Sequence, residues 1–417
     1  MELKRVVVTG LGAITPVGST VKDFWKGLVN GRNGVGEITR FDSSKFKTHF
    51  AAEVKGYDPL NYFDRKDARK YDLFAQFALI SAFEAVDHSC INPVNTNYDD
   101  VGVIVTAGIG GITHFFQESS EFFQGDGVPR FSPYYIPKMI LNIPAGIVSI
   151  KYGFRGPNYA TVSACASSSH AIIAGFDQIR LGRAKVIVAG GAEAGICEAG
   201  IGGFNAMHAL SVRNDDPLTA SRPFDLNRDG FVMGEGGGCI ILEELEHALR
   251  RGADIYAELV GVGMSSDAYH ITSPHPEGFG ACLSMERAIK DAGIDKSEID
   301  HINTHGTSTL QGDVAEVTAI MKLFGENAYR ISLNATKSMT GHLLGGAGAV
   351  EAIATILALR NDIVPPTINH FEDDPKIDPK LDFTYHQARK REVRYALSNA
   401  FGFGGHNTSL LFKKYTN

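Results

Sequence analysis

The chain has 417 residues, of which 44% are hydrophobic and 21% are charged, and its formal net charge is -7. This composition is that of a globular protein large enough for two domains or for one large duplicated domain. The negative charge argues against a nucleic-acid-binding protein, and no apolar run is long enough to cross a bilayer. We therefore expect neither a nucleic acid nor a membrane as a partner.

Strand-like and helical segments alternate along the chain, and the second half repeats the order of the first. The first half is expected to form a strand at 5–10, a helix at 71–88, a strand at 101–106, a helix at 166–181 and a strand at 185–189. The second half is expected to form a strand at 255–261, a helix at 282–293, a strand at 299–303, a helix at 346–360 and a strand at 395–399. The match predicts a duplicated α/β fold, with mostly parallel sheets covered by helices, divided into 1–253 and 254–417.

The N-terminus, M-E-L-K-R-V-V-V-T-G, enters an apolar strand directly and lacks the pattern of a signal peptide. The five cysteines are widely spaced without a C-x-x-C pair, which argues against disulfides or structural zinc and favours a reducing cytoplasm. G-L-G at 10–12 does not complete a dinucleotide fingerprint, and H-E-x-x-H is absent. We therefore expect no NAD and no metal.

One cysteine lies where a strand gives way to a helix. Cys165, in V-S-A-C-A-S-S-S-H, follows strand-like residues and precedes the helix expected from 166. Unpaired N–H groups and the dipole at a helix start favour a thiolate, and the small neighbours leave room for a substrate. We interpret Cys165 as a nucleophile; the alternative, which we keep for the other four cysteines, is a buried structural thiol.

Two histidines of the second half stand among glycines and hydroxyl residues. His305 lies in N-T-H-G-T-S-T, and His342 lies in K-S-M-T-G-H-L-L-G-G-A-G-A. Loops at the carboxyl ends of strands from both halves can converge, so we expect these imidazoles to meet Cys165. A thiol can hold an acyl group as a thioester, and two imidazoles can stabilise an enolate. The combination predicts carbon–carbon bond formation on thioesters rather than hydrolysis.

Two further features are ambiguous from spacing alone. Lys337 and Glu351 flank His342 and form either a buried ion pair or two solvated surface charges. G-F-G-G-H-N at 402–407 follows a strand and is either an oxyanion-binding turn of backbone N–H groups or only a tight turn.

The longest motifs are V-V-V-T-G-L-G-A-I-T-P-V-G, S-A-C-A-S-S-S-H, N-T-H-G-T-S-T, T-K-S-M-T-G-H-L-L-G-G-A-G-A-V-E and N-A-F-G-F-G-G-H-N. With these motifs in this order, the chain resembles the β-ketoacyl-[acyl-carrier-protein] synthases from end to end, and the synthase II type most closely. The resemblance implies the thiolase fold, in which two similar α/β halves form a five-layer αβαβα sandwich, normally as a homodimer. It also implies a decarboxylative Claisen condensation of an acyl-cysteine with a malonyl thioester. The only prosthetic group involved would be the phosphopantetheine that acyl carrier protein brings with the substrate.

The resemblance assigns a role to each matching position. Cys165 would carry the acyl group, His305 and His342 would bind the malonyl thioester oxygen, and the backbone N–H groups of Cys165 and Phe403 would form the oxyanion hole. Lys337 and Glu351 would be a supporting ion pair, with Lys337 counted among the catalytic residues and Glu351 among the substrate-binding ones. The implied substrate contacts are Ile109 in the acyl channel, Thr307 and Thr309 on the pantetheine arm, and Phe401 beside the gate residue Phe403. Lys66, Arg69 and Lys70, in R-K-D-A-R-K, match a carrier-protein docking helix, although such a charge run is by itself usually a solvated face.

Several related functions are separated by single features of the chain. Thiolase needs a second cysteine near the C-terminus, and no cysteine follows Cys282. The synthase III type pairs cysteine with histidine and asparagine, and the non-catalytic partner subunits of polyketide systems lack the nucleophile. A cysteine hydrolase would leave the second histidine without a role. A monofunctional polyketide-type ketosynthase stays open as the alternative.

Overall fold

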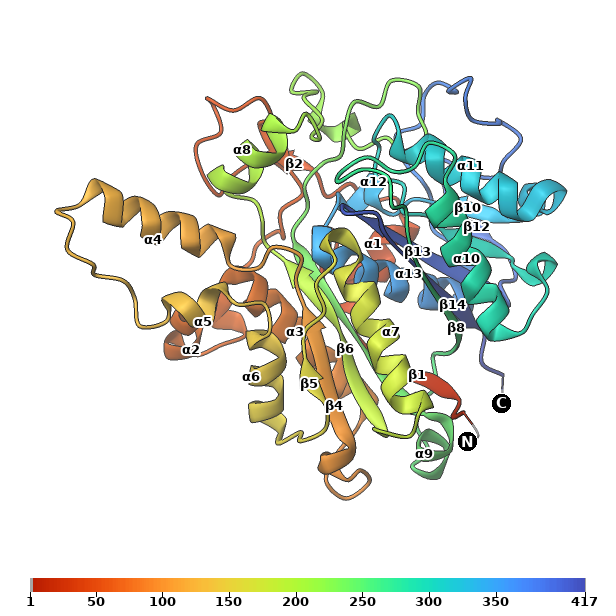
Figure 1. Cartoon of the computed structure of the whole chain (residues 1–417), viewed down its shortest axis with the longest axis horizontal. Helices are drawn as coiled ribbons and strands as arrows, with labels where there is room; N and C mark the ends of the chain where they lie inside the picture. The colour runs from red at the N-terminus through yellow and green to blue at the C-terminus, as the bar shows by residue number, and fades with distance from the viewer. Residues whose placement is uncertain (1–2, 417) are drawn as a thin grey trace.

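The computed structural model describes residues 3–416, and ten of its strands form one continuous sheet (Figure 1). The strands of the first half are β1 (Val6–Ile14), β4 (Val101–Thr106), β5 (Asn158–Tyr159), β6 (Val186–Glu193) and β7 (Gly236–Glu244). Those of the second half are β8 (Ala257–Ser266), β9 (His301–Asn303), β10 (Ser332–Asn334), β13 (Tyr395–Gly402) and β14 (His406–Lys413). Two small sheets pair β2 (Gly36–Glu37) with β3 (Phe50–Ala51) and β11 (Ile363–Val364) with β12 (Arg389–Lys390).

The sheet contains the same five-strand pattern twice. Its order is β10-β9-β13-β14-β8-β1-β7-β6-β4-β5, so β5-β4-β6-β7-β1 in the first half matches β10-β9-β13-β14-β8 in the second. The two patterns meet where β1 pairs antiparallel with β8. The predicted duplication is therefore confirmed, and we keep 1–253 and 254–417 as its proposed division.

The expectation of mostly parallel sheets is wrong. In each half the two outer ladders are parallel, β4 with β5 and β6, and β9 with β10 and β13. The ladders of β7 and β14 are antiparallel. The turn between β13 and β14 spans only 403–405, and so short a connection can join only antiparallel strands.

The helices are α1 (Val21–Val29), α2 (Arg65–Lys70), α3 (Leu73–Ser89), α4 (Ile112–Gln124), α5 (Tyr135–Met139), α6 (Ile143–Tyr152), α7 (Ser167–Arg180), α8 (Glu198–Ala206), α9 (Leu245–Arg250), α10 (Phe279–Ala292), α11 (Gly312–Phe324), α12 (Lys337–Thr340) and α13 (Ala347–Asn361). Helices α3 and α6 cover the outer face of the first half, and α10 and α11 cover that of the second. Between the two halves lie α7 and α13, which contact each other and strands of both halves. The layers form the five-layer αβαβα sandwich of the thiolase fold.

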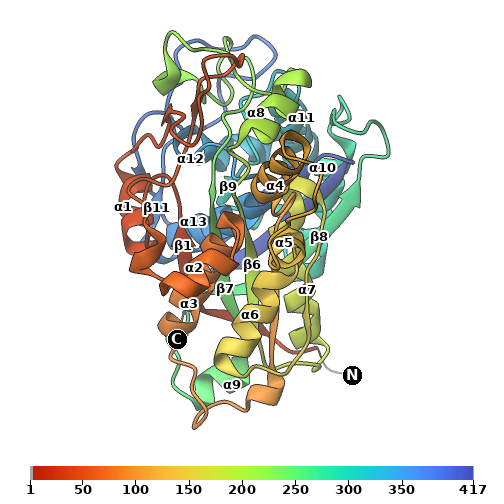
Figure 2. The ribbon, with the colours of Figure 1, turned by 90° about the vertical axis from the view of Figure 1, so that its left-hand side faces the viewer.

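The middle helix α13 shows why this order of layers suits the sequence. Its residues 347–359 are all buried, and they are small or apolar on every side of the helix except for Glu351 and Thr355. A helix that is apolar all round must be enclosed, and here sheet lies on both sides of it. Helix α4, by contrast, extends away from the body of the molecule (Figure 1), and α4 and α5 lie on the side that faces the viewer in Figure 2. No helix within 3–416 has the length and apolarity needed to cross a membrane.

One element boundary matters for function. The strand expected at 185–189 continues to Glu193, so the following residues G-G-A-E, 190–193, also belong to β6. A Cβ on Gly190 would lie 2.1 Å from the carbonyl oxygen of Gly238, so glycine at this position lets β6 pack against β7. The carboxylate of Glu193 is thereby carried to the end of the strand, close to Cys165.

Candidate active site

Cys165 lies in a tight turn that recurs in the second half. Ala164–Ala166 form a single 3₁₀ turn, η3, which leads directly into α7, and Leu344–Gly346 form the equivalent turn, η7, before α13. Both turns have a left-handed residue that is not glycine, Ala164 with φ 51° and Leu344 with φ 45°. Such backbone is costly and persists only where its surroundings hold it. The duplication therefore aligns Cys165 with Gly345.

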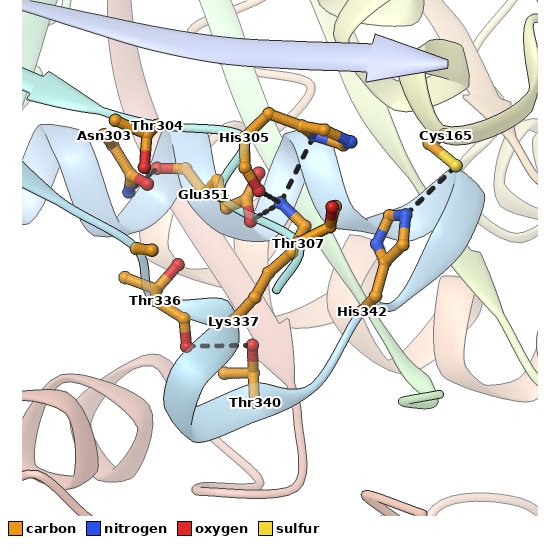
Figure 3. Close-up of polar contacts among 12 residues, drawn as sticks. Cys165, Asn303, Thr304, His305, Thr307, Thr336, Lys337, Thr340, His342 and Glu351 are labelled. Carbon is orange, nitrogen blue, oxygen red and sulfur yellow. Dashed lines mark hydrogen bonds and ion pairs between the residues drawn. The ribbon is translucent and has the colours of Figure 1, made fainter. Parts of the chain in front are cut away.

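The thiol and both histidines converge at the boundary between the halves, as the sequence predicts (Figure 3). Nε2 of His342 lies 3.0 Å from Sγ of Cys165, and the ring centroids of His305 and His342 are 5.3 Å apart. His305 follows β9, and His342 lies between α12 and η7. The three side chains are buried and line one cavity of about 500 Å³.

Lys337 and Glu351 form a buried ion pair behind the wall of this cavity, not a pair of surface charges. Nζ of Lys337 also donates to the carbonyl oxygen of His305 at 2.6 Å and lies 3.4 Å from Nδ1 of the same residue (Figure 3). An ammonium group can only donate, so Nδ1 must accept and the ring proton of neutral His305 must sit on Nε2. Lys337 thereby turns the Nε2–H of His305 into a hydrogen-bond donor for the cavity.

Burial keeps both imidazoles neutral. It holds the pKa of His305 well below its ordinary value, and the charge of Lys337 and the neighbouring His342 add to the effect. Burial and then the charge of Lys337 lower the pKa of His342 in the same direction. Burial also raises the pKa of the Glu351 carboxyl to about 7, against the opposing effect of Lys337.

The thiol does not follow the expectation of a helix-stabilised thiolate. Burial raises the pKa of Cys165 to about 12, and the charge of Lys337 and the backbone N–H groups of Phe403 and Cys165 only partly oppose the rise. The thiol therefore keeps its proton at neutral pH. Desolvation outweighs the helix start because Cys165 lies in a buried turn and not at an exposed helix end.

The 402–405 turn closes over the thiol. The backbone N–H of Phe403 faces Sγ together with that of Cys165 itself. A Cβ on Gly402 would lie 2.6 Å from the carbonyl oxygen of Ser163 and 3.2 Å from the backbone nitrogen of Cys165. Only a glycine allows the end of β13 to approach the turn this closely, so the two N–H donors depend on it.

The cavity is lined by Ile109, Thr307, Thr309, Phe401 and Phe403, but not by Glu351, which lies behind its wall in the ion pair with Lys337. The hydroxyl oxygens of Thr307 and Thr309 are 3.0 Å apart, and the ring of Phe401 lies 5.6 Å from that of His305. These distances put hydroxyl groups and one aromatic ring on the histidine side of the cavity.

The predicted docking residues Lys66, Arg69 and Lys70 of α2 do not line this cavity. Lys66 and Arg69 are exposed, whereas Nζ of the half-buried Lys70 bonds Oδ1 of Asp67 at 2.6 Å. Among the described residues, Lys66, Arg69 and the neighbouring Arg65 form no ion pair, so this short helix presents three free cations.

Sequence reasoning missed three groups that shape the site. Glu316 of α11 accepts the backbone N–H groups of His305 and Gly306, both at 2.9 Å, and the ring of Phe231 packs edge-on against His342 with centroids 5.3 Å apart. Glu193 accepts backbone N–H groups beside Cys165. The acid within the mostly apolar helix G-D-V-A-E-V-T-A-I was the available signal for Glu316, while nothing local marked Phe231.

The histidine spacing does not create a metal site. His301 stands four residues before His305, but its Nδ1 bonds the carbonyl oxygen of Ser332 at 2.8 Å in the core. Among residues 3–416, no group of three or more histidine, cysteine or acidic side chains is arranged to hold a metal ion.

Comparison with known proteins gives consistent matches over the whole chain. Residues 3–248 match the model of the beta-ketoacyl synthase N-terminal domain, and 256–371 match that of the C-terminal domain. The chain is 50% identical over 415 residues to a 3-oxoacyl-[acyl-carrier-protein] synthase 2 of Synechocystis, with 100% of this chain and 99% of the relative covered. A protein of the same name from Vibrio harveyi is 48% identical, with 99% of both chains covered.

Solved structures give the same picture. A beta-ketoacyl synthase from Burkholderia phymatum is 35% identical with a TM-score of 0.91, covering 99% of this chain and 100% of that one. A type II polyketide ketosynthase in complex with its acyl-carrier protein is 33% identical with a TM-score of 0.92, with the same coverage.

Proposed function

The chain belongs to the β-ketoacyl synthase family, and we propose that it is a 3-oxoacyl-[acyl-carrier-protein] synthase of the synthase II type. It would extend a fatty acyl chain by two carbons through condensation with a malonyl thioester. The observation that carries the proposal is the meeting of one thiol with two neutral imidazoles in a single buried cavity. The identities support fatty acyl over polyketide substrates, since the relatives named synthase 2 are 45–50% identical to this chain, whereas the type II polyketide ketosynthase is 33% identical.

In the first half-reaction, Sγ of Cys165 attacks the thioester carbonyl of an acyl carrier protein. The new C–S bond forms as the pantetheine C–S bond breaks, and the thiol proton ends on the released pantetheine thiol. Nε2 of His342 lies 3.0 Å from Sγ, and the mechanism places the proton of the neutral ring on this nitrogen, where it stabilises the sulfur as the thiol proton leaves. The N–H groups of Cys165 and Phe403 bind the oxyanion, and one such donor typically contributes about 10²–10³ in rate.

In the second half-reaction, the malonyl thioester oxygen accepts hydrogen bonds from Nε2–H of His305 and of His342. The bond between the malonyl carboxylate and methylene carbons breaks, CO₂ leaves, and the electron pair forms an enolate whose oxygen these two donors stabilise. The enolate carbon then attacks the acyl-Cys165 carbonyl. The C–S bond to Cys165 breaks, the 3-oxoacyl chain remains on the carrier protein, and the sulfur takes up one proton from solvent. Lys337 supports this step by fixing the tautomer of His305.

The substrates determine the proposed partner. The acyl and malonyl groups arrive on acyl carrier protein in the cytoplasm, and no cofactor other than its phosphopantetheine takes part. Thr307 and Thr309 offer hydroxyls to the amides of that arm, and Ile109 contacts the acyl chain. Lys66 and Arg69 are exposed on α2 and suit an acidic carrier surface, with Lys70 contributing less because Asp67 engages it.

A homodimer is proposed from the surface of the extended α4–α5 segment. Its exposed side chains include Phe115, Phe123 and Ile136, of which Phe123 is 82% exposed. Apolar residues gathered in this way mark an interaction surface. Strand β5 at the end of the sheet pairs on one side only, with β4, so its other edge can accept a second strand. Light scattering of the purified chain should give the mass of two chains.

Cys165→Ala tests the assignment of the two half-reactions. Without Sγ the variant should take up no acyl group and form no 3-oxoacyl product, whereas His305 and His342 should still decarboxylate malonyl-carrier protein. Mass spectrometry of the intact protein and measurement of released CO₂ report the two steps separately. Elongation by the variant would refute the nucleophile, and loss of decarboxylation would show that the histidines do not act independently of it.

A further inference from the structure

Glu193, the last residue of β6, is a buried carboxylate that accepts backbone N–H groups from both halves of the molecule. It is 0% exposed, and its donors are Gly108 at 2.7 Å, Ile109 at 3.2 Å, Gly110 at 2.9 Å and Gly345 at 3.1 Å. No basic side chain among residues 3–416 forms an ion pair with it. Within the described residues, the hydrogen bonds of its side chain join the loop at 108–110 to η7.

The duplication gives this contact a counterpart at the active site. Strands β6 and β13 are equivalent and have eight residues each, so Glu193 corresponds to Gly402. Gly402 packs against η3 of the first half, next to the backbone nitrogen of Cys165, and Glu193 bonds η7 of the second half. Each half thus supports the helix-starting turn of the other. The contact between Gly402 and η3 forms the wall of the site beside Cys165, and the contact between Glu193 and η7 is its equivalent in the other half.

The segments that Glu193 joins carry two side chains of the cavity wall. Ile109 and Leu344 both line the cavity, and Leu344 packs in the same apolar cluster as Cys165. The two backbones are in close contact, since a Cβ on Gly345 would lie 2.0 Å from the nitrogen of Gly108. The negative charge of Glu193 also contributes to the raised pKa of Cys165, as expected for a close neighbour. Glu193 therefore sets the relative positions of Ile109 and Leu344 beside the thiol.

The histidine side of the cavity is held by a different network. Backbone N–H groups at His305 and Gly306 bond Glu316, and Lys337 bonds His305 and Glu351. His342 is held separately by its backbone hydrogen bonds to Val232 at 2.7 Å and Gly234 at 2.9 Å, and none of these contacts passes through Glu193. A disturbance at Glu193 should therefore reach the acyl chain and not the malonyl group.

We propose that Glu193 is a positioning residue for the acyl channel, which fixes Ile109 and Leu344 so that long acyl chains can reach Cys165. The inference rests on the proposed function, because it assumes that Cys165 carries the acyl group. Glu193→Gln tests it with almost no change of volume. An amide offers one acceptor oxygen, and its NH₂ group must face backbone N–H donors, so either the 108–110 loop or Gly345 loses its partner.

Glu84→Gln is a matched control. Glu84 is also a carboxylate that accepts two backbone N–H groups, from Ala13 and Val21 at 2.8 Å each, and it does not line the cavity. Transfer of acetyl, decanoyl and myristoyl groups from carrier protein to Cys165 is timed by mass spectrometry under single-turnover conditions. Decarboxylation of malonyl-carrier protein is measured on the same samples.

We expect Glu193→Gln to slow myristoyl transfer by on the order of 10–100-fold, the usual cost of a misplaced substrate, with acetyl transfer and decarboxylation close to wild type. Glu84→Gln should leave the chain-length profile unchanged. Equal slowing of all primers, or an unchanged profile in Glu193→Gln, would overturn the proposal. Absence of acylation in the wild-type protein would instead refute the proposed function.

Ile109→Ala covers the case in which Glu193→Gln does not fold. Since Glu193 acts through this side chain, Ile109→Ala should slow myristoyl transfer selectively, and an even profile would overturn the proposal. Where both variants fold, the double variant Glu193→Gln with Ile109→Ala should discriminate against long chains no more than the stronger of the two single variants. The reason is that both changes act on the acyl chain through the side chain of Ile109. Fully multiplicative effects would mean that Glu193 does not act through Ile109.

Discussion

Replacing Lys337 by methionine removes a buried cation and keeps most of the side-chain volume. Nζ lies 3.4 Å from Nδ1 of His305 and forms an ion pair with Glu351, and both partners of the pair are at most 2% exposed. Without this donor, the proton of neutral His305 is free to move to Nδ1, and Nε2 then cannot donate to the enolate oxygen. Losing one such donor should cost about 10²–10³ in the rate of decarboxylation.

The pH dependence of the variant makes this reasoning specific. The charge of Lys337 lowers the pKa of His305, so its removal raises that pKa. As the pH falls through the new value, the ring becomes protonated on both nitrogens and regains an Nε2–H. The decarboxylation rate of Lys337→Met should therefore rise toward acid pH relative to wild type, whose His305 stays neutral. A ratio of the two rates that does not change with pH would refute the tautomer role.

Stability must be separated from this effect. Breaking a buried ion pair by removing one partner costs about 3–5 kcal/mol. Burial already raises the pKa of Glu351 to about 7, and losing Lys337 raises it further. A folded-state pKa above the unfolded value destabilises only at pH above the unfolded value, so the loss should shrink as pH falls. The double variant Lys337→Met with Glu351→Gln should recover stability in denaturant titrations without recovering decarboxylation; recovery of both would make Lys337 purely structural.

Three further predictions concern the thiol and the docking helix. Gly402→Ala should slow acyl transfer by on the order of 10²-fold, because its Cβ would lie 2.6 Å from the carbonyl oxygen of Ser163 and displace an oxyanion donor. Formation of acyl-enzyme by the variant as fast as by the wild type would contradict this. Alkylation of Cys165 by iodoacetamide should still accelerate above the ordinary cysteine pKa of about 8.5, since burial raises its pKa to about 12, whereas a plateau near neutral pH would indicate a resting thiolate. Reversing the charges of Lys66 and Arg69 should raise KM for carrier-protein substrates and leave pantetheine thioesters unaffected; equal effects on both would exclude docking through α2.

The sequence was sufficient where a pattern is local or repeated. Alternating strand and helix segments predicted the two halves, and the strand expected at 101–106 coincides with β4. Small residues around Cys165, His305 and His342 indicated positions open to substrate, and the structure brings all three to one cavity. The direction of β7 was not predictable in this way, because a strand's own residues do not encode whether its neighbour runs parallel or antiparallel.

Long-range electrostatics was the other quantity that local patterns could not supply. The start of a helix favours a thiolate, but the pKa of Cys165 is governed by burial, which depends on segments hundreds of residues apart. The pairing of Lys337 with Glu351 was undecidable for the same reason, since it requires both side chains to be enclosed. Phe231 escaped notice because a ring that packs on His342 need obey no sequence rule.

The duplication explains why this site needs both halves and yet is not symmetric. The turns η3 and η7 share their left-handed geometry, but one holds Cys165 and the other Gly345. The strand ends that support them differ in the complementary way: Gly402 leaves space and backbone N–H groups beside the thiol, while Glu193 fills the equivalent space with a carboxylate that binds N–H groups. Of the two equivalent turns, η3 therefore carries the nucleophile, whereas η7 is bonded by Glu193 and supports the wall of the cavity. A thiol placed at Gly345 would face the carboxylate of Glu193, which disfavours a thiolate, so the chemistry is confined to Cys165.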